Sequence, residues 1–142
     1  MIEEVRLADG TTLLDASGAL TAHEIRDAQK QLAELRQVGY VTVHVAGRGS
    51  GDDVREELDD IGLRTVRLNI HRLIVVGSDA RILHLAAERE GSWDGESLHV
   101  STAADAYDEI QRLRGDAVAV LVTGSLSEPL HEVAERMKGE NA

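Results

Sequence analysis

The stretch from Leu73 to Ser78 reads Leu-Ile-Val-Val-Gly-Ser, and it decides how the rest of the chain is interpreted. Four consecutive aliphatic residues predict a strand that is covered on both faces, as strands of parallel sheets are. The Gly-Ser pair that follows predicts a turn, with Ser78 as the N-cap of a helix that runs to Glu90. A buried strand that leads directly into a helix is the repeating unit of α/β proteins.

The same alternation extends in both directions from this strand. We expect further strands at residues 11–15, 40–45, 98–100 and 117–122, with a short ribbon at 4–7 that turns at 9–10. We expect helices at residues 22–38, 54–60, 63–68, 103–114 and from 129 onward. The alternation predicts a three-layer, doubly wound (Rossmann-like) α/β fold with a mostly parallel sheet of five or six strands. At this length, residues 1–142 are expected to form one domain.

Local signals mark the ends of several of these helices. Thr21 and Glu24 have the spacing of a capping box at the start of the first helix, which should end at Gly39. Gly115 has the position of a C-cap for the helix that precedes it, and Pro129 fits the first turn of the last helix.

Composition excludes several classes of function. The 26 acidic residues exceed the 15 Lys and Arg residues, and the resulting charge of −11 would repel nucleic acid. The absence of cysteine excludes disulfides, thiolate metal sites and thiol nucleophiles. The acidic start and the short apolar runs are unlike a signal peptide or a membrane span. We therefore expect a cytoplasmic protein with neither a nucleic acid nor a membrane as its partner.

Candidate site residues lie in the loops that follow the predicted strands, because doubly wound sheets bind ligands beyond the carboxyl ends of their strands. Asp15 ends the first strand, where it would either point into the crevice or cap the next loop. Residues 123–125 offer hydroxyl groups and N–H donors for a phosphate or carboxylate, or else an N-cap and a turn. The candidates for ligand binding are Asp15, Ser17, Thr21, Gly47, Arg48, Ser50, Thr123, Gly124 and Ser125.

Other motifs for nucleotide, metal or nucleophile chemistry are incomplete. The glycines at 47, 49 and 51 do not have the dinucleotide-binding spacing, so they form either a flexible turn or a weak phosphate cradle. Neither Lys30 nor Lys138 lies in a P-loop, and the chain has no nucleophile elbow. The six histidines lack metal-ligand spacing, and His44 inside a strand is expected to be a half-buried packing residue. No catalytic residue and no metal site are predicted.

Three segments carry a resemblance to a known family. Residues 12–15 read Thr-Leu-Leu-Asp, residues 69–77 lead through an apolar strand to Val-Gly, and residues 115–125 join Gly-Asp to Thr-Gly-Ser through another strand. With Leu130 and Val133 in the last helix, this order resembles the C-terminal domain of Mur ligases, the bacterial ATP-dependent amide ligases of peptidoglycan precursor synthesis. The similarity is closest to the members that add D-alanyl-D-alanine to the UDP-N-acetylmuramoyl tripeptide.

The resemblance implies a doubly wound fold, and it implies that ATP and Mg²⁺ are used by the full ligase. The P-loop and the UDP-sugar site of these ligases lie on two preceding domains, so this chain alone should hold no cofactor and form no amide bond. Four positions carry the family's site residues over: Asp15, Gly47, Gly124 and Ser125. Residues 16–22 replace a second acidic residue and its neighbours, Leu58 replaces a histidine, and Thr123 replaces a lysine.

Two hypotheses of function follow. In the first, the chain is a Mur-ligase C-terminal-type domain, either part of a longer ligase or a diverged free-standing relative. It would close over an ATP-binding domain and help to orient the acyl phosphate and the attacking amine. In the second, it is a non-catalytic module that binds a small anionic ligand or a protein partner at the same strand ends. A homo-oligomer formed through its helices is a third possibility.

Overall fold

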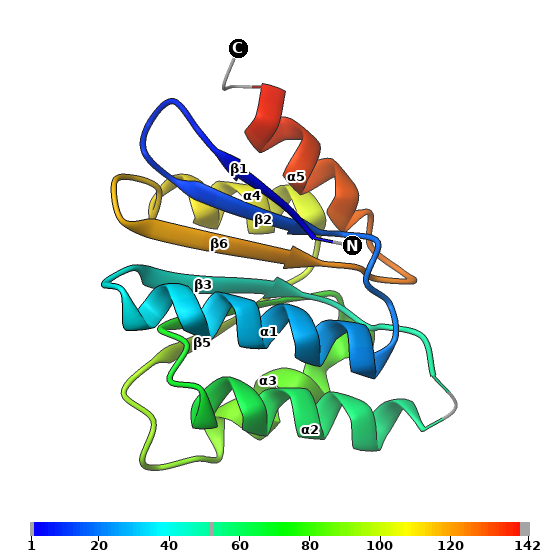
Figure 1. The fold of residues 1–142 in the computed structure, drawn as a ribbon. Helices are drawn as coiled ribbons and strands as arrows, with labels where there is room; N and C mark the ends of the chain where they lie inside the picture. The colour runs from blue at the N-terminus through cyan, green and yellow to red at the C-terminus, as the bar shows by residue number, and fades with distance from the viewer. Residues whose placement is uncertain (1, 52, 140–142) are drawn as a thin grey trace.

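The computed structural model describes residues 2–51 and 53–139, which form a six-stranded sheet between two layers of helices (Figure 1). The strands are β1 (Glu3–Arg6), β2 (Thr12–Ala16), β3 (Val41–Ala46), β4 (Arg72–Val76), β5 (Glu96–Val100) and β6 (Val118–Thr123). Their order across the sheet is β1-β2-β6-β3-β4-β5, and only β1 runs antiparallel to its neighbour. The predicted doubly wound, mostly parallel α/β fold is therefore confirmed.

The helices divide between the two faces of the sheet. They are α1 (Ala22–Gln37), α2 (Val54–Arg67), the short 3₁₀ helix η1 (Ser78–Ala80), α3 (Arg81–Glu88), α4 (Ala103–Gln111) and α5 (Leu130–Gly139). One face is covered by α1, α2 and α3, and the other by α4 and α5. No helix in the described ranges has both the length and the apolarity needed to cross a bilayer.

The stretch from Leu73 to Val76 is buried on both faces, as its sequence predicts. Leu73 and Val75 pack in the core under α2 and α3, whereas Ile74 and Val76 pack in the core under α4 and α5. The exposed fraction of these four residues is at most 2%. Each fully buried aliphatic side chain contributes about 1.5–3 kcal/mol to stability, so this strand anchors both layers.

Several predicted turns and caps are confirmed. Thr21 and Glu24 form the capping box, with the Glu24 N–H donating to Thr21 Oγ1 over 3.1 Å. Helix α4 has a side-chain cap as well, in which Thr102 Oγ1 accepts from the Asp105 N–H over 3.1 Å. The ribbon of β1 and β2 turns at Gly10, which has a φ of +93°.

Other helix boundaries differ from prediction. Residues 54–67 form one helix rather than two, because Gly62 lies inside α2 where it packs against α3. A Cβ at Gly62 would lie 2.6 Å from the Leu83 carbonyl oxygen, so the glycine permits a close helix contact and does not end the helix. Likewise Ser78 is not an N-cap: Gly77 holds that position with a φ of +96° and no side-chain cap, and α3 ends at Glu88.

The remaining differences are at the last two helices and at an edge strand. Helix α4 ends at Gln111, so Gly115 is not its C-cap; instead the Gly115 N–H donates to Thr11 Oγ1 over 2.9 Å. Strand β5 begins at Glu96 because Glu96 already pairs with Arg72 of β4, and its N–H donates to His71 O over 3.0 Å. Helix α5 begins at Leu130, one residue after Pro129.

Candidate functional site

The carboxyl ends of β2, β3, β4 and β6 meet at one edge of the sheet, which we call the rim. It consists of Asp15 and the loops at 16–21, 47–51, 77–80 and 124–129. The register places Asp15 beside Val122 and Ala16 beside Thr123 on the neighbouring strand. Asp15 and Ser125 therefore lie at the same end of the sheet, toward the strand arrowheads in Figure 1.

The rim loops are joined to one another by backbone hydrogen bonds. The Gly124 N–H donates to Ala19 O over 2.9 Å, and the Ser50 N–H donates to Leu20 O over 2.8 Å. The Leu126 N–H donates to Arg48 O over 2.8 Å. These three N–H groups already have acceptors within the protein, so they are not available to cradle a phosphate.

Two rim glycines are required for close packing between the loops. A Cβ at Gly47 would lie 2.6 Å from the Ser125 Cβ, and a Cβ at Gly124 would lie 2.7 Å from Ser17 O. No real Cβ tolerates such distances, so a side chain at either position would force the loops apart. The structure thus gives these two glycines a packing role at the positions where the sequence suggested ligand contact.

Asp15 is held by a lysine that the sequence did not single out. Its carboxylate accepts from Lys138 Nζ over 2.6 Å, from Ser17 Oγ over 2.7 Å and from the Ser17 N–H over 3.0 Å. Burial alone would raise the pKa of Asp15, but the bonds from Lys138 and Ser17 outweigh it and lower that pKa below its usual range. Lys138 also bonds Glu3 over 2.7 Å, so this cluster ties α5 to β1 and β2.

Thr123 was predicted to face a ligand, but it lies in the core. Its side chain is fully buried, and its Oγ1 is 3.0 Å from His44 Nε2. His44 is also fully buried rather than half-buried, because β3 is a central strand covered by α1 and α2. Burial lowers the pKa of His44 to about 3, so the ring is neutral near pH 7.

A chain of hydrogen bonds extends from His44 to the helices. Gln29 Nε2 lies 3.3 Å from His44 Nδ1 and donates to Thr65 Oγ1 over 3.0 Å. If Gln29 donates to Nδ1, then His44 Nε2 carries the proton and donates to Thr123. The network thus links α1, α2 and β3 to the last residue of β6, directly before the rim loop that contains Ser125.

The remaining candidate residues differ in whether their side chains already have hydrogen-bond partners within the protein. Ser125 Oγ accepts from the N–H groups of Ser127 and Glu128 over 3.2 and 3.1 Å, which supports the reading of a turn before the last helix. Thr21 is engaged in the capping box. Arg48 has no ion-pair partner among the described residues, and its Nε is buried without an acceptor. Arg48 is therefore the rim cation that remains able to bind an anion.

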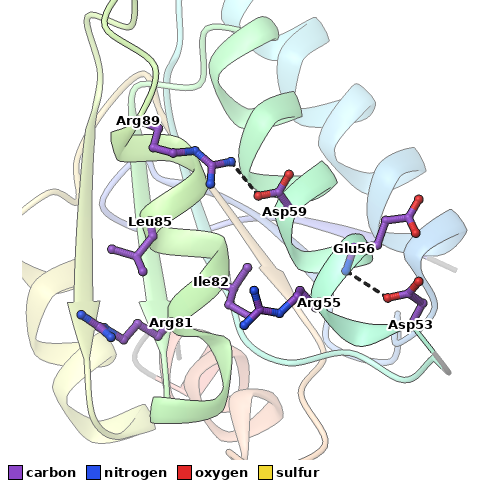
Figure 2. Close-up of a pocket in the computed structure, with 8 residues that line it drawn as sticks. All are labelled: Asp53, Arg55, Glu56, Asp59, Arg81, Ile82, Leu85 and Arg89. Atoms are coloured by element: carbon purple, nitrogen blue, oxygen red, sulfur yellow. Dashed lines mark hydrogen bonds and ion pairs between the residues drawn. The ribbon is translucent and has the colours of Figure 1, made fainter.

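A separate pocket of about 710 Å³ lies between α2 and α3 (Figure 2). Arg89 donates to Asp59 across it over 2.7 Å, and Arg55 reaches from α2 toward Ile82 of α3. The lining residues are Asp53, Arg55, Glu56, Asp59, Arg81, Ile82, Leu85 and Arg89. Its three cations balance three carboxylates, so the pocket carries no excess charge for either kind of ion. Sequence reasoning missed this pocket because a groove between two helices depends on how they pack, which no local pattern records.

Comparisons with known proteins agree with the fold, although no family model matches the chain. The chain is 29% identical over 150 residues to the UDP-N-acetylmuramoyl-tripeptide–D-alanyl-D-alanine ligase of Mycobacterium leprae. That match covers 95% of the chain but only 29% of the mycobacterial ligase. The chain thus spans less than a third of this curated relative.

Solved structures give the same result. A MurF structure from Acinetobacter baumannii matches with a TM-score of 0.72 at 18% identity, over 96% of this chain and 30% of that one. The ADP complex of MurF from Thermotoga maritima matches with a TM-score of 0.68 at 13% identity, over 98% and 30%. A Haemophilus ducreyi domain, assigned to a ligase for a UDP-N-acetylmuramate substrate, matches over the full length of both chains with a TM-score of 0.61 at 10% identity. The chain therefore resembles the C-terminal domain of Mur ligases in sequence, and it has the same fold.

Proposed function

We propose that this chain acts as the C-terminal-type domain of a Mur ligase that forms an amide bond in peptidoglycan precursor synthesis. The observation that carries the proposal is the 29% identity to the mycobacterial ligase, which extends over 95% of the chain. The similarity in fold to MurF and other Mur ligases supports it. Because Mur ligases use nucleotide-linked substrates and ATP, we also propose that the chain works in the cytoplasm.

The chain's own part in that reaction would be positioning. It has no P-loop, and its described residues contain no group of three or more His, Asp or Glu side chains that could hold a metal ion. We therefore assign ATP and Mg²⁺ to a partner ATP-binding domain and no catalytic residue to this chain. Arg48 and Ser125 at the rim are the groups that would contact the anionic substrate, since Arg48 lies beside the 124–129 loop and has no ion-pair partner among the described residues.

A fusion protein tests this function. The chain replaces the matching part of the Mycobacterium leprae ligase, and ADP release is measured with ATP, the UDP-linked tripeptide and D-alanyl-D-alanine. We expect the fusion to release ADP only when all three are present, while the ligase without its last domain stays inactive. Arg48→Gln should reduce the rate roughly tenfold, the effect of losing one charged hydrogen bond. A fusion that binds ATP yet releases no more ADP than the truncated ligase would overturn the proposal.

The second candidate is a free-standing module that binds a small anion at the rim. The observation that favours it is Arg48, which has no ion-pair partner within residues 2–51 and 53–139. In that case the chain alone should be stabilised by its ligand, by about 2.7 kcal/mol at a hundred times the dissociation constant. Thermal melting of the chain and of its Arg48→Gln variant with citrate or phosphate separates the candidates. Stabilisation that needs Arg48, together with an inactive fusion, would favour the module.

A further inference from the structure

The pocket between α2 and α3 is a groove in which two aliphatic side chains lie among charged groups (Figure 2). Ile82 is half-buried, and 39% of Leu85 is exposed. The two residues are three positions apart on α3, so they are neighbours on the helix surface. We call the residues that line this groove the α2–α3 face. A partner that covers the face would remove its aliphatic surface from water.

The α2–α3 face carries cations and carboxylates that have no partner within the chain. Among the described residues, Arg55 and Arg81 form no ion pair. Asp53 and Glu56 form none either, although the Asp53 side chain accepts from the Glu56 N–H over 3.3 Å as the N-cap of α2. A partner with the complementary pattern of charges could therefore pair with both kinds of group.

The carboxylates at the start of α2 repel one another. Asp53 is the largest cause, followed by burial, Asp60 and Glu57, and together they raise the pKa of Glu56 above its usual range. Arg26 of α1 does not relieve this repulsion at Glu56, because it bonds Asp60 over 3.4 Å. A cation from a partner would stabilise the charged form of Glu56.

The unpaired groups of the two helices lie at the same level but on opposite sides of the helix pair. Helices α2 and α3 each follow a parallel strand, so both begin at the rim end of the sheet. Asp53 and Glu56 lie at the start of α2, and Arg81 is the first residue of α3. In Figure 2 the two carboxylates are on the side of α2 away from α3, whereas Arg81 and Leu85 project from the side of α3 away from α2. The two helices separate these charges, so they do not pair within one chain.

A two-fold axis parallel to the helices would bring the groups together in a dimer. Such a rotation places α3 of one copy on α2 of the other and keeps the helix starts at the same level. Arg81 of each copy then faces Asp53 and Glu56 of the other copy, and the aliphatic side chains of α3 are covered by the opposite α2. Because the symmetry repeats every contact, each attractive pair occurs twice.

We propose that the α2–α3 face is the interface of a homodimer, in which a second copy of this chain packs about that axis with Arg81 facing Glu56 of the other copy. The occupant is a second copy because the face carries arginines and carboxylates in equal number, which makes it complementary to itself. A purely acidic or purely basic partner would bring like charges together. No residue of the rim takes part, so the inference goes beyond the proposed function and does not rest on it.

The size of the face indicates a weak dimer. At 1.5 Å per residue, α2 is about 21 Å long and α3 about 12 Å. Two such helices from each copy bury an area at the low end of specific interfaces, and we expect a dissociation constant of roughly 10–100 μM. The charge of −11 on each copy opposes association. Salt at about 0.15 M screens charges more than about 8 Å apart, but it acts less on pairs in contact.

Sedimentation equilibrium of the full 142-residue chain tests the proposal, at about 5 μM to about 1 mM protein in about 0.15 M sodium chloride. We expect an equilibrium between monomer and dimer. Arg81→Glu and Glu56→Arg should each weaken association roughly tenfold, since each change reverses two contacts in the dimer. An equimolar mixture of the two variants should associate about as tightly as the native chain. In the mixed dimer the reversed charges face each other, and the native pair remains at the symmetry-related contact.

Matched variants serve as controls, and circular dichroism checks that each variant is folded. Arg112→Glu and Glu132→Arg reverse exposed charges at α4 and α5, on the other face of the sheet, and should leave association unchanged. Leu85→Ser should weaken association roughly tenfold, whereas Leu126→Ser, at a more exposed leucine of the rim, should not.

Two kinds of result would overturn the proposal. The first is a chain that stays monomeric up to about 1 mM, or folded charge-reversal variants of the α2–α3 face that associate as tightly as the native chain. The second is a mixture of those variants that associates no better than either variant alone, or an equal loss of association in the controls. Either result of the second kind would mean that the dimer does not use the proposed pairing.

Discussion

Replacing Thr123 by valine should destabilise the protein out of proportion to the small change in shape. Valine has nearly the same volume, but it removes the hydroxyl group that lies 3.0 Å from His44 Nε2 in a fully buried site. The His44 N–H would then be buried without an acceptor, which costs about 1–3 kcal/mol. For a domain of this length, a loss near 2 kcal/mol corresponds to a fall in Tm of about 7 °C.

Urea unfolding and calorimetry at pH 7 measure the effect, and a double-mutant cycle assigns it to the bond. In a His44→Leu background Thr123 keeps only its long 3.4 Å bond to Val45 O, so the further change Thr123→Val should cost clearly less than it does in the native background. Gln29 keeps its bond to Thr65 in that background. The reasoning is refuted if Thr123→Val costs less than about 0.5 kcal/mol, or if it costs the same in both backgrounds.

Three further changes test other parts of the structure. Because the pKa of His44 is depressed to about 3, its contribution to stability is present above pH 6.5 and is lost as the pH falls toward 3. The free energy of unfolding, measured with urea, should fall by about 1.4 kcal/mol for each pH unit below pH 6.5, and His44→Leu should remove this dependence. The same pH dependence in His44→Leu would contradict the assignment. Lys138→Met should raise the pKa of Asp15 toward its ordinary value, and carboxyl NMR measures this change. Because the ion pair is partly exposed, its loss should lower the free energy of unfolding by roughly 1–2 kcal/mol. An unchanged titration of the Asp15 carboxyl group would contradict the prediction. Gly62→Ala should destabilise by roughly 1–3 kcal/mol although alanine favours helix, because its Cβ would lie 2.6 Å from a carbonyl oxygen of α3. The control Gly91→Ala has open space and should change stability little, so equal effects at the two glycines would be contrary to this account.

The fold could be predicted because its signals are local. The aliphatic run that begins at Leu73 predicts a strand, and the capping box at Thr21 predicts the start of a helix. Each signal lies within a few residues. The predicted break between residues 60 and 63 is wrong, because Gly62 lies inside α2 and nothing nearby in sequence reveals the helix α3 that packs on it.

The site could be predicted only in outline. The shared edge of Asp15 and Ser125 follows from parallel strands, and the structure places both there. That Thr123 points into the core depends on which face of β6 it occupies, and Lys138 reaches Asp15 from a helix 123 positions later in the chain. Such pairings depend on tertiary packing and leave no trace in local patterns.

Hydrogen exchange of the fusion with the mycobacterial ligase tests most directly whether the rim is the working face of this chain. Exchange is measured by mass spectrometry with and without ATP and the UDP-linked tripeptide. We expect the two substrates to slow exchange in the loops at 16–21, 47–51 and 124–129, and to leave the edge of the sheet at the amino ends of the parallel strands unchanged. Protection confined to the opposite edge of the sheet, or no protection anywhere in this chain, would contradict a ligase domain that works through its strand ends.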